Sequence, residues 1–177
     1  MNDEMRIRLR AIEKDDIPVT LEWRNDSQIK YYHSGHPFPV NFENELSWYE
    51  KHSKSNFPTT IFGVEYIPEN KLVGLTSLGN INMINRSAEF SKLLGDKSLT
   101  GKGLGLEMTK LTIEFGFYDL GLNRIYAYQL LDNLASIKVN EKCGFKNEGI
   151  LRSSIFKNNK FIDQQIMSLL KEEYRKD

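Results

Sequence analysis

The sequence predicts a single α/β (α+β) domain with a central mixed, mostly antiparallel sheet, and two observations carry this prediction. In the first half of the chain, strand-like runs follow one another through short connections, which is typical of antiparallel neighbours. In the second half, a glycine-rich loop and an amphipathic segment separate two further strand-like runs, the pattern of a right-handed β-α-β unit. We expect this one domain to span residues 1–177.

Composition narrows the class of protein. Hydrophobic residues make up 40% of the chain and charged residues 27%, as in ordinary soluble proteins. Lys plus Arg number 24 and Asp plus Glu 24, so no excess of basic residues favours nucleic acid. No run is long enough to span a membrane, and the N-terminus lacks a secretory signal, so we expect a cytoplasmic protein. The single cysteine, Cys143, excludes an internal disulfide and a cysteine-based zinc site and is expected to be a buried structural residue.

The first quarter of the chain alternates strand and helix signals. Residues 5–12 alternate apolar and basic side chains, which predicts a half-buried strand. A helix capped by Asp15-Asp16 runs to about Trp23, and a second helix covers residues 41–52. Between them, residues 29–40 are rich in aromatic side chains and are expected to be irregular.

Three antiparallel strands are expected next. Residues 59–66 and 72–78 flank a turn at 68–71, which predicts a hairpin, and residues 80–83 extend its second strand. The third strand covers residues 87–94.

The second half begins with a helix over residues 103–118, where apolar side chains recur at spacings of three and four. Gly121 ends this helix, and residues 124–130 form the strand that completes the β-α-β unit.

The last elements are a helix and a hairpin. Asp132 or Asn133 caps the helix, and Gly144 ends it. Residues 145–156 and 160–170 are strands joined by an Asn-Asn pair, which is a tight hairpin signal.

The loop before the long helix predicts an anion site. Gly101, Gly103 and Gly105 let the backbone approach a ligand, and a helix that starts there points free N–H groups at it. An ordinary glycine-rich turn is the structural alternative. Walker A spacing fails, because Gly95 and Gly101 are one residue too far apart and Gly103 stands where Ser or Thr should hold magnesium. The dinucleotide fingerprint fails as well, because Leu106 replaces its third glycine.

Two segments resemble the GCN5-related N-acetyltransferase (GNAT) superfamily. Thr100-Gly-Lys-Gly-Leu-Gly105 is similar to its acetyl-CoA loop, [QR]-x-x-G-x-[GA], and departs at the first position. Residues 133–145, NLASIKVNEKCGF, resemble the family's N-x-x-[AS]-x-x-x-[YN]-E-K-x-G-F segment. The resemblance implies a GNAT fold, whose splayed central strands hold acetyl-CoA while acetyl passes directly to a primary amine without a metal. Residues 87–90 and 93–95 are similar to the ribosomal-protein-alanine acetyltransferase branch, which also includes spermidine and amino-sugar-nucleotide acetyltransferases.

The resemblance also implies how acetyl-CoA is held. Backbone groups at the end of the third antiparallel strand and in the glycine loop are expected to bind it, together with side chains of the segment after residue 132. These cofactor-binding candidates are Leu93, Leu94, Gly95, Leu99, Thr100, Gly101, Lys102, Gly103, Leu104, Gly105, Leu106, Asn133, Ser136, Asn140 and Lys142. A backbone donor among the first three would stabilise the developing oxyanion. A plain N-cap is the alternative for Asn133, and a solvated helix face is the alternative for Lys142.

Two catalytic residues are expected. An alkyl amine has a pKa of about 10 and must lose a proton before it attacks the thioester. The resemblance places Glu89 beside the thioester as general base; a solvent-facing position or a pair with Arg86 is the alternative. Many members protonate the leaving thiolate with a tyrosine, but Asn140 stands there, and an amide supplies no proton. Ser136, a tyrosine of the strand at 124–130, or water are the replacements.

The acceptor is left open by the sequence. By analogy with the family, the aromatic segment walls the acceptor pocket, which makes Tyr31, Tyr32 and His33 substrate-binding candidates and brings in His36; an apolar plug is the alternative. The segment contains no acid, which favours a neutral or anionic small molecule over a polyamine or a protein N-terminus. An acyl-CoA-binding sensor without turnover is the alternative function, because the tyrosine is missing. The oligomeric state stays open, a homodimer included.

Overall fold

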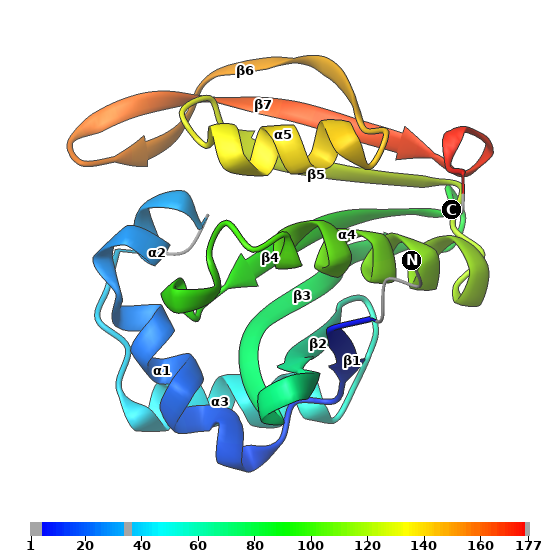
Figure 1. The fold of residues 1–177 in the computed structure, drawn as a ribbon. Coiled ribbons are helices and arrows are strands. Elements are labelled where there is room, and N and C mark those ends of the chain that lie inside the picture. Colours follow the sequence, from blue (N-terminus) through cyan, green and yellow to red (C-terminus); the bar gives the residue numbers. More distant parts are fainter. Residues whose placement is uncertain (1–4, 34–36, 176–177) are drawn as a thin grey trace.

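A seven-stranded sheet forms the centre of the protein, in the order β1-β2-β3-β4-β5-β7-β6 (Figure 1). The computed structural model describes residues 5–33 and 37–175. The strands are β1 (Ile7–Arg10), β2 (Thr60–Tyr66), β3 (Lys71–Asn82), β4 (Ser87–Leu94), β5 (Arg124–Leu130), β6 (Lys146–Lys157) and β7 (Lys160–Leu170). Every neighbouring pair is antiparallel except β4 and β5, which are parallel. The expected mixed, mostly antiparallel sheet is confirmed.

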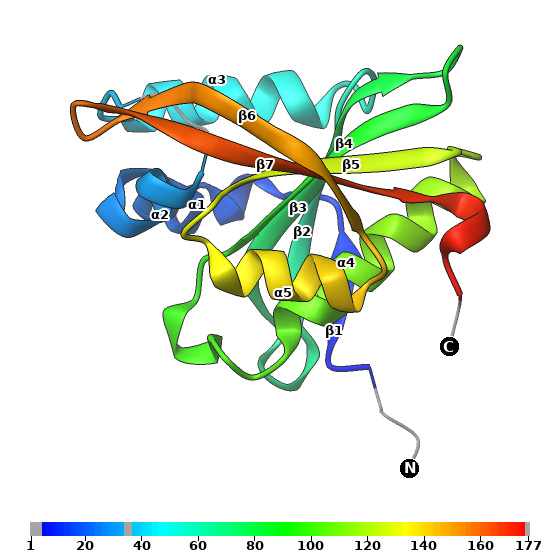
Figure 2. The same ribbon diagram turned by 90° about the horizontal axis from the view of Figure 1, so that it is seen from above.

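Helices cover both faces of the sheet. The α-helices are α1 (Ile17–Asn25), α2 (Ser27–Tyr32), α3 (Phe42–Ser53), α4 (Leu104–Glu114) and α5 (Leu134–Lys142). Short 3₁₀ turns lie at Lys14–Asp16, Ile67–Glu69, Lys97–Leu99 and Lys171–Glu173, and a π-helical turn lies at Phe115–Asp119. Figure 2 shows α1, α2 and α3 on one face and α4 and α5 on the other. Among the described residues, no helix is long and apolar enough to cross a membrane.

The sheet splits along the line between β4 and β5. Their parallel pairing covers only three residues, from Ser87 opposite Arg124 to Glu89 opposite Tyr126. Past these pairs the strands diverge, and α2 lies at the open end (Figure 1). The splayed central strands implied by the family resemblance are therefore present.

Local signals near the split are confirmed in detail. The Asn133 side chain caps α5 and accepts a hydrogen bond from the Ser136 N–H at 3.2 Å. Asn158 and Asn159, between β6 and β7, have φ of 49° and 59°, as a tight hairpin turn requires. Cys143 is buried with 6% of its surface exposed, as expected.

Two expectations are wrong in part. Residues 29–32, expected to be irregular, belong to α2, because the Asp26 carboxylate accepts hydrogen bonds from the N–H groups of Gln28 and Ile29 and starts a short helix. The long helix changes to a π turn after Glu114, which leaves Tyr118 half exposed. His36 lies outside the described residues.

The core fixes the strand that borders the gap. Ala88 and Phe90 of β4 are buried in a cluster on the α4 and α5 side. At the end of β4, a Cβ on Gly95 would fall 2.1 Å from the ring of Trp23 on α1. Only glycine therefore lets α1 pack against this end of the strand.

Candidate active site

The glycine loop forms an open cradle at the start of α4. Gly101 and Gly103 have φ of 79° and 86°, a conformation that favours glycine, and Gly103 is the N-cap of α4. The N–H groups of Leu104 and Gly105 lie in the first turn and have no intrahelical acceptor. The side chains of Leu99 and Leu104 are buried in the core, so only their backbone is available to a ligand. These groups fit a pyrophosphate bound through N–H donors.

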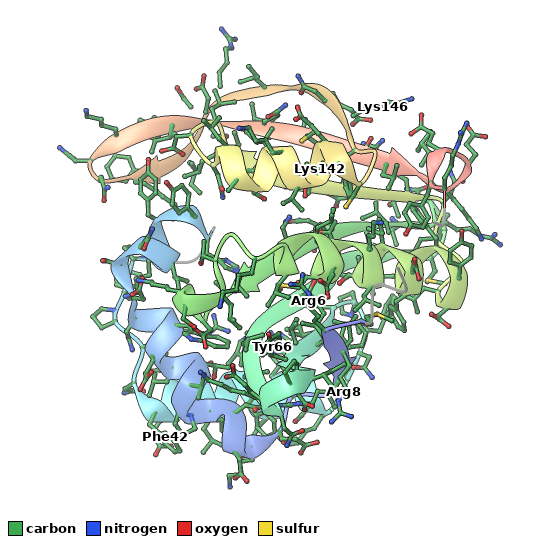
Figure 3. The ribbon with its side chains drawn as sticks, viewed as in Figure 1. Arg6, Arg8, Phe42, Tyr66, Lys142 and Lys146 are labelled. Carbon is green, nitrogen blue, oxygen red and sulfur yellow. The ribbon has the colours of Figure 1, made fainter. Side chains whose placement is uncertain are left out.

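A cation that the sequence analysis did not single out borders this loop. The Arg6 side chain donates from Nε to Glu107 Oε1 at 2.8 Å, and a Cβ on Gly103 would lie 3.3 Å from its Nη2 (Figure 3). Thr100 and Lys102 are exposed in the same turn. An arginine in an alternating strand gives no signal that it lies beside a loop so distant in the sequence.

The backbone groups of the three residues at the end of β4 do not all face the gap. The Gly95 N–H donates to the Val73 carbonyl at 2.9 Å and is therefore used within the sheet. Because backbone groups alternate along an antiparallel strand, Leu93 faces β3 and Leu94 faces the gap. Of the three residues expected to present backbone groups to a thioester, Leu94 is best placed to do so.

A small cavity of about 60 Å³ lies in the gap between β4 and β5. It brings together side chains from both strands, α5 and the end of α2. Its lining is Tyr32, His33, Glu89, Phe90, Ser91, Lys92, Ala127, Tyr128, Gln129, Asn133, Ser136 and Asn140. Six of these residues are candidates from the sequence, contributed by three elements that are distant in the chain.

Glu89 lies at the last paired position of β4, where the gap between β4 and β5 begins. Its carboxylate accepts a hydrogen bond from Asn80 Nδ2 at 2.9 Å, so its partner is an amide rather than Arg86. Strand alternation places it on the same face of β4 as Ser91 and Leu93, toward α1 and α3. Its role as general base stays a prediction.

Asn140 is buried and bonded at both ends of its amide. Its Oδ1 accepts from Lys92 Nζ at 2.8 Å, and its Nδ2 donates to Gln129 Oε1 at 3.0 Å. Lys92 Nζ also lies 3.4 Å from the Ser136 hydroxyl. Sequence reasoning missed Lys92, because a lysine next to Ser91 in a strand gives no signal of its own.

A second cavity, of about 210 Å³, adjoins the first on the side of α1 and α3. It is lined by Thr20, Arg24, Ile29, Lys30, His33, Val40, Trp48, Ile61, Leu75, Thr76, Ser77, Ser91, Lys92 and Leu93. His33, Ser91 and Lys92 belong to both linings and mark where the two cavities meet. We call this second space the acceptor cavity.

A buried ion pair supports the acceptor cavity. Arg24 Nε lies 2.7 Å from Glu45 Oε2, and the Glu45 side chain is only 1% exposed. The Arg24 guanidinium also stacks over the Trp48 ring at 4.3 Å from its centroid. Burial lowers the pKa of His33, and the nearby cations Arg24 and Lys157 lower it further.

Helix α2 is hydrogen-bonded to residues on the far side of the split. The Tyr31 hydroxyl donates to Asp132 Oδ2 at 2.7 Å, just before α5. Lys157 Nζ, at the end of β6, donates to the carbonyls of Lys30 and His33 at 2.6 and 2.7 Å. Tyr31 lines neither cavity, whereas Tyr32 and His33 do. The hydrogen bond of Tyr31 positions its helix, and its contact with a substrate stays a prediction.

Lys142 lies apart from the other cofactor candidates. It is the last residue of α5 and is exposed (Figure 3). Asn133 and Ser136 lie at the other end of the helix, facing the gap. The cofactor role of Lys142 stays a prediction.

The fold and the site define a known class of enzyme. A family model described as "Acetyltransferase (GNAT) domain" matches residues 6–146. The chain belongs to this family and is an N-acetyltransferase that uses acetyl-CoA as acetyl donor. In the described part of the chain, no group of three or more His, Cys, Asp or Glu side chains forms a metal site.

Individual relatives are similar over nearly the whole chain. The spermidine N(1)-acetyltransferase of Vibrio cholerae is 31% identical over 169 residues, which cover 96% of this chain and 95% of that protein. The corresponding enzyme of Escherichia coli strain K12 is 27% identical, over 95% of this chain and 88% of its own. A crystal structure of the Vibrio cholerae enzyme with CoA and spermine superposes with a TM-score of 0.89 at 29% identity, covering 97% of this chain and 99% of that one.

Proposed function

We propose that the protein acetylates the primary amine of a small molecule whose other groups are neutral or anionic. The observation that carries this proposal is the charge of the acceptor cavity. Arg24, Lys30 and Lys92 line it, and no carboxylate of the described residues does so. The Arg24 charge is offset by Glu45, so Lys30 and Lys92 supply the net positive charge.

This charge discriminates between acceptor classes. A polyamine carries several ammonium groups and would bring like charges together in a partly desolvated space, which costs free energy. An amino sugar that carries phosphate groups would instead pair its anionic end with the lysines. The indole of Trp48 and the apolar side chains of Ile29 and Val40 suit a sugar ring or alkyl body.

The chemical roles follow from the two faces of β4. We assign Glu89 as the base that takes the proton of the attacking amine, because it lines the small cavity in the gap between β4 and β5, where the thioester would lie. The backbone N–H of Leu94 is the proposed donor to the thioester oxygen. The free N–H groups around Gly103 are the proposed pyrophosphate contacts.

Spermidine is the second candidate acceptor, and the named relatives favour it. Both are spermidine acetyltransferases similar over nearly their full length. The two candidates can be separated by measuring activity with both classes of acceptor. The charge of the cavity predicts a preference for an anionic amine, whereas the similarity to these relatives predicts a preference for spermidine.

The test measures release of the CoA thiol with a thiol reagent. Wild-type protein is mixed with acetyl-CoA and, in turn, glucosamine 6-phosphate, an uncharged amino sugar and spermidine. We expect kcat/KM to be at least tenfold higher for the phosphorylated amino sugar than for spermidine. Lys30→Glu should narrow or reverse this ratio, whereas Lys54→Glu, an exposed site at the end of α3, should leave it unchanged.

Two results would contradict the proposal. A preference for spermidine that Lys30→Glu does not alter would show that the lysines of the cavity do not select the acceptor, and it would favour a polyamine as the substrate. Tight binding of acetyl-CoA without thiol release from any amine would favour the sensor alternative.

A further inference from the structure

Lys92 is a cation enclosed by neutral groups. Its Nζ donates to Asn140 Oδ1 at 2.8 Å, lies 3.4 Å from the Ser136 hydroxyl, and sits 5.1 Å from the centre of the Phe90 ring. Among the described residues it forms no ion pair. The hydrogen bond to Asn140 is in turn fixed, because the Asn140 amide donates to Gln129.

This arrangement is costly for a purely structural residue. A partly buried ammonium without a counter-ion loses hydration that neutral partners restore only in part. Burial accordingly lowers the pKa of Lys92 to about 8, and the Cys143 thiol is the nearby group that opposes this shift. An apolar side chain would fill the same space without that cost, so the charge itself calls for a role.

The position of Lys92 suggests which role. It points from β4 toward α5, where Ser136 and Asn140 are, whereas Glu89 lies on the opposite face of the same strand. Lys92 also lines both cavities at the place where they meet. Glu89 and Lys92 both line the small cavity in the gap, so an acetyl group held there would have Lys92 on one side and Glu89 on the other.

We propose that Lys92 is the proton donor to the thiolate that leaves acetyl-CoA. This inference rests on the proposed acetyl transfer. The amine nitrogen forms a C–N bond to the acetyl carbon, and its proton passes to Glu89. The C–S bond breaks with its electron pair going to sulfur, and the proton of the Lys92 ammonium moves to that sulfur. Free CoA thiol and a neutral Lys92 result, and exchange with solvent returns the proton from Glu89 to Lys92.

The proton affinities of donor and acceptor are matched. An alkyl thiol such as that of cysteine has a pKa of about 8.5, close to that of the Lys92 ammonium, so the transfer is nearly balanced in free energy. At pH 7 the ammonium is still protonated and can act. Asn140, which cannot supply a proton, would hold the donor in place.

Other titratable groups surround Lys92 and must be separated from it in a pH study. They are Glu89 on β4, Tyr128 on β5, Tyr32 and His33 at the end of α2, Cys143 after α5, and Arg24 and Lys30 across the acceptor cavity. Only a feature of the pH profile that disappears when Lys92 alone is replaced belongs to Lys92.

The first measurement is the pH dependence of turnover. We expect wild-type kcat to fall as pH rises through about 8, because Lys92 in its neutral form has no proton to give to the leaving thiolate. Lys92→Met should lower kcat by about 10²-fold or more, the usual range for a general acid, and remove this alkaline limb. Its KM for acetyl-CoA should stay within threefold, and Lys54→Met should behave like wild type. A Lys92→Met variant with unchanged kcat and an unchanged alkaline limb would overturn the proposal.

A second measurement needs no acceptor. Free CoA is bound to the protein, and its thiol is titrated by thiolate absorbance. We expect the pKa of the bound thiol to be lower in wild type than in Lys92→Met, because the ammonium stabilises the thiolate. Equal values in the two proteins would overturn the placement of Lys92 even if no acceptor were found, whereas failure of thiol release with every amine would count only against the proposed function.

Lys92→Arg separates proton donation from charge. A guanidinium stays protonated with a pKa above about 12, so it keeps the positive charge without giving up its proton. We expect Lys92→Arg to keep the low pKa of the bound CoA thiol seen in wild type, while its kcat is as low as that of Lys92→Met. Recovery of kcat by Lys92→Arg would refute proton transfer and leave charge stabilisation as the role of this residue.

Discussion

Removing the Arg24 guanidinium should destabilise the protein strongly. Arg24→Met leaves the Glu45 carboxylate, which is 1% exposed, without the partner that now lies 2.7 Å away. Breaking a buried pair by removing one partner costs about 3–5 kcal/mol, because the remaining charge stays desolvated. The lost stacking on Trp48 adds about 0.5–1 kcal/mol. For a chain of this size, the pair alone corresponds to a fall in melting temperature of roughly 6–20 °C.

Denaturant titration of wild type, Arg24→Met and the double variant Arg24→Met/Glu45→Met measures this cost. We expect the double variant to recover most of the lost free energy of unfolding, since two apolar side chains replace both charges. Lys146→Met is the matched control: its pair with Glu173 is exposed, so it should change the free energy of unfolding by less than about 1 kcal/mol. An Arg24→Met variant that unfolds like this control, or a double variant less stable than Arg24→Met, would contradict the expected cost of the unpaired carboxylate.

Three further predictions concern the glycine loop, the proposed base and the ion pair between Lys71 and Asp96. Gly103→Val should weaken acetyl-CoA binding more than tenfold in calorimetry by blocking backbone approach; Gly121→Val imposes similar strain at φ of 66° away from the loop and should retain affinity. Glu89→Gln should lower kcat by about 10²–10⁴-fold with an unchanged KM for acetyl-CoA, and full activity would exclude it as the base. A hydrogen bond from Lys71 lowers the pKa of Asp96 to about 2, so its contribution to stability is complete above pH 3.8 and is lost as pH falls toward 2. Asp96→Asn should flatten this part of the curve of unfolding free energy against pH; a curve unchanged from wild type would contradict the assignment.

The parts of the fold that the sequence predicts are those specified by local chemistry. The Asn133 cap and the positive-φ pair Asn158 and Asn159 act within a few residues, so their geometry is readable from the residues themselves. The short α2 is missed because six residues offer too little periodicity, although Asp26 supplies a cap. The π turn after Glu114 depends on how the helix packs, which no local pattern states.

The candidate site also contains some residues that the local sequence predicts and others that only the tertiary structure brings together. The glycine loop carries its own signature, so residues around Gly103 are found by spacing alone. Lys92 and Asn140 lie 48 residues apart, and their hydrogen bond exists only because α5 covers the open side of β4. Neither residue type signals this contact, so Lys92 becomes a candidate only once the structure places it in the gap.

The attachments of α2 have a consequence for how the two substrates depend on each other. The helix follows α1 directly on one side of the split, yet Tyr31 and Lys157 fasten it to the other side. Any widening of the split when one substrate enters must displace α2 or break these bonds, and α2 carries Lys30 and His33 into the acceptor cavity. If one substrate widens the split, its binding would change the affinity for the other substrate by the same factor in both directions, and the Kd of each substrate measured with and without the other would show this linkage.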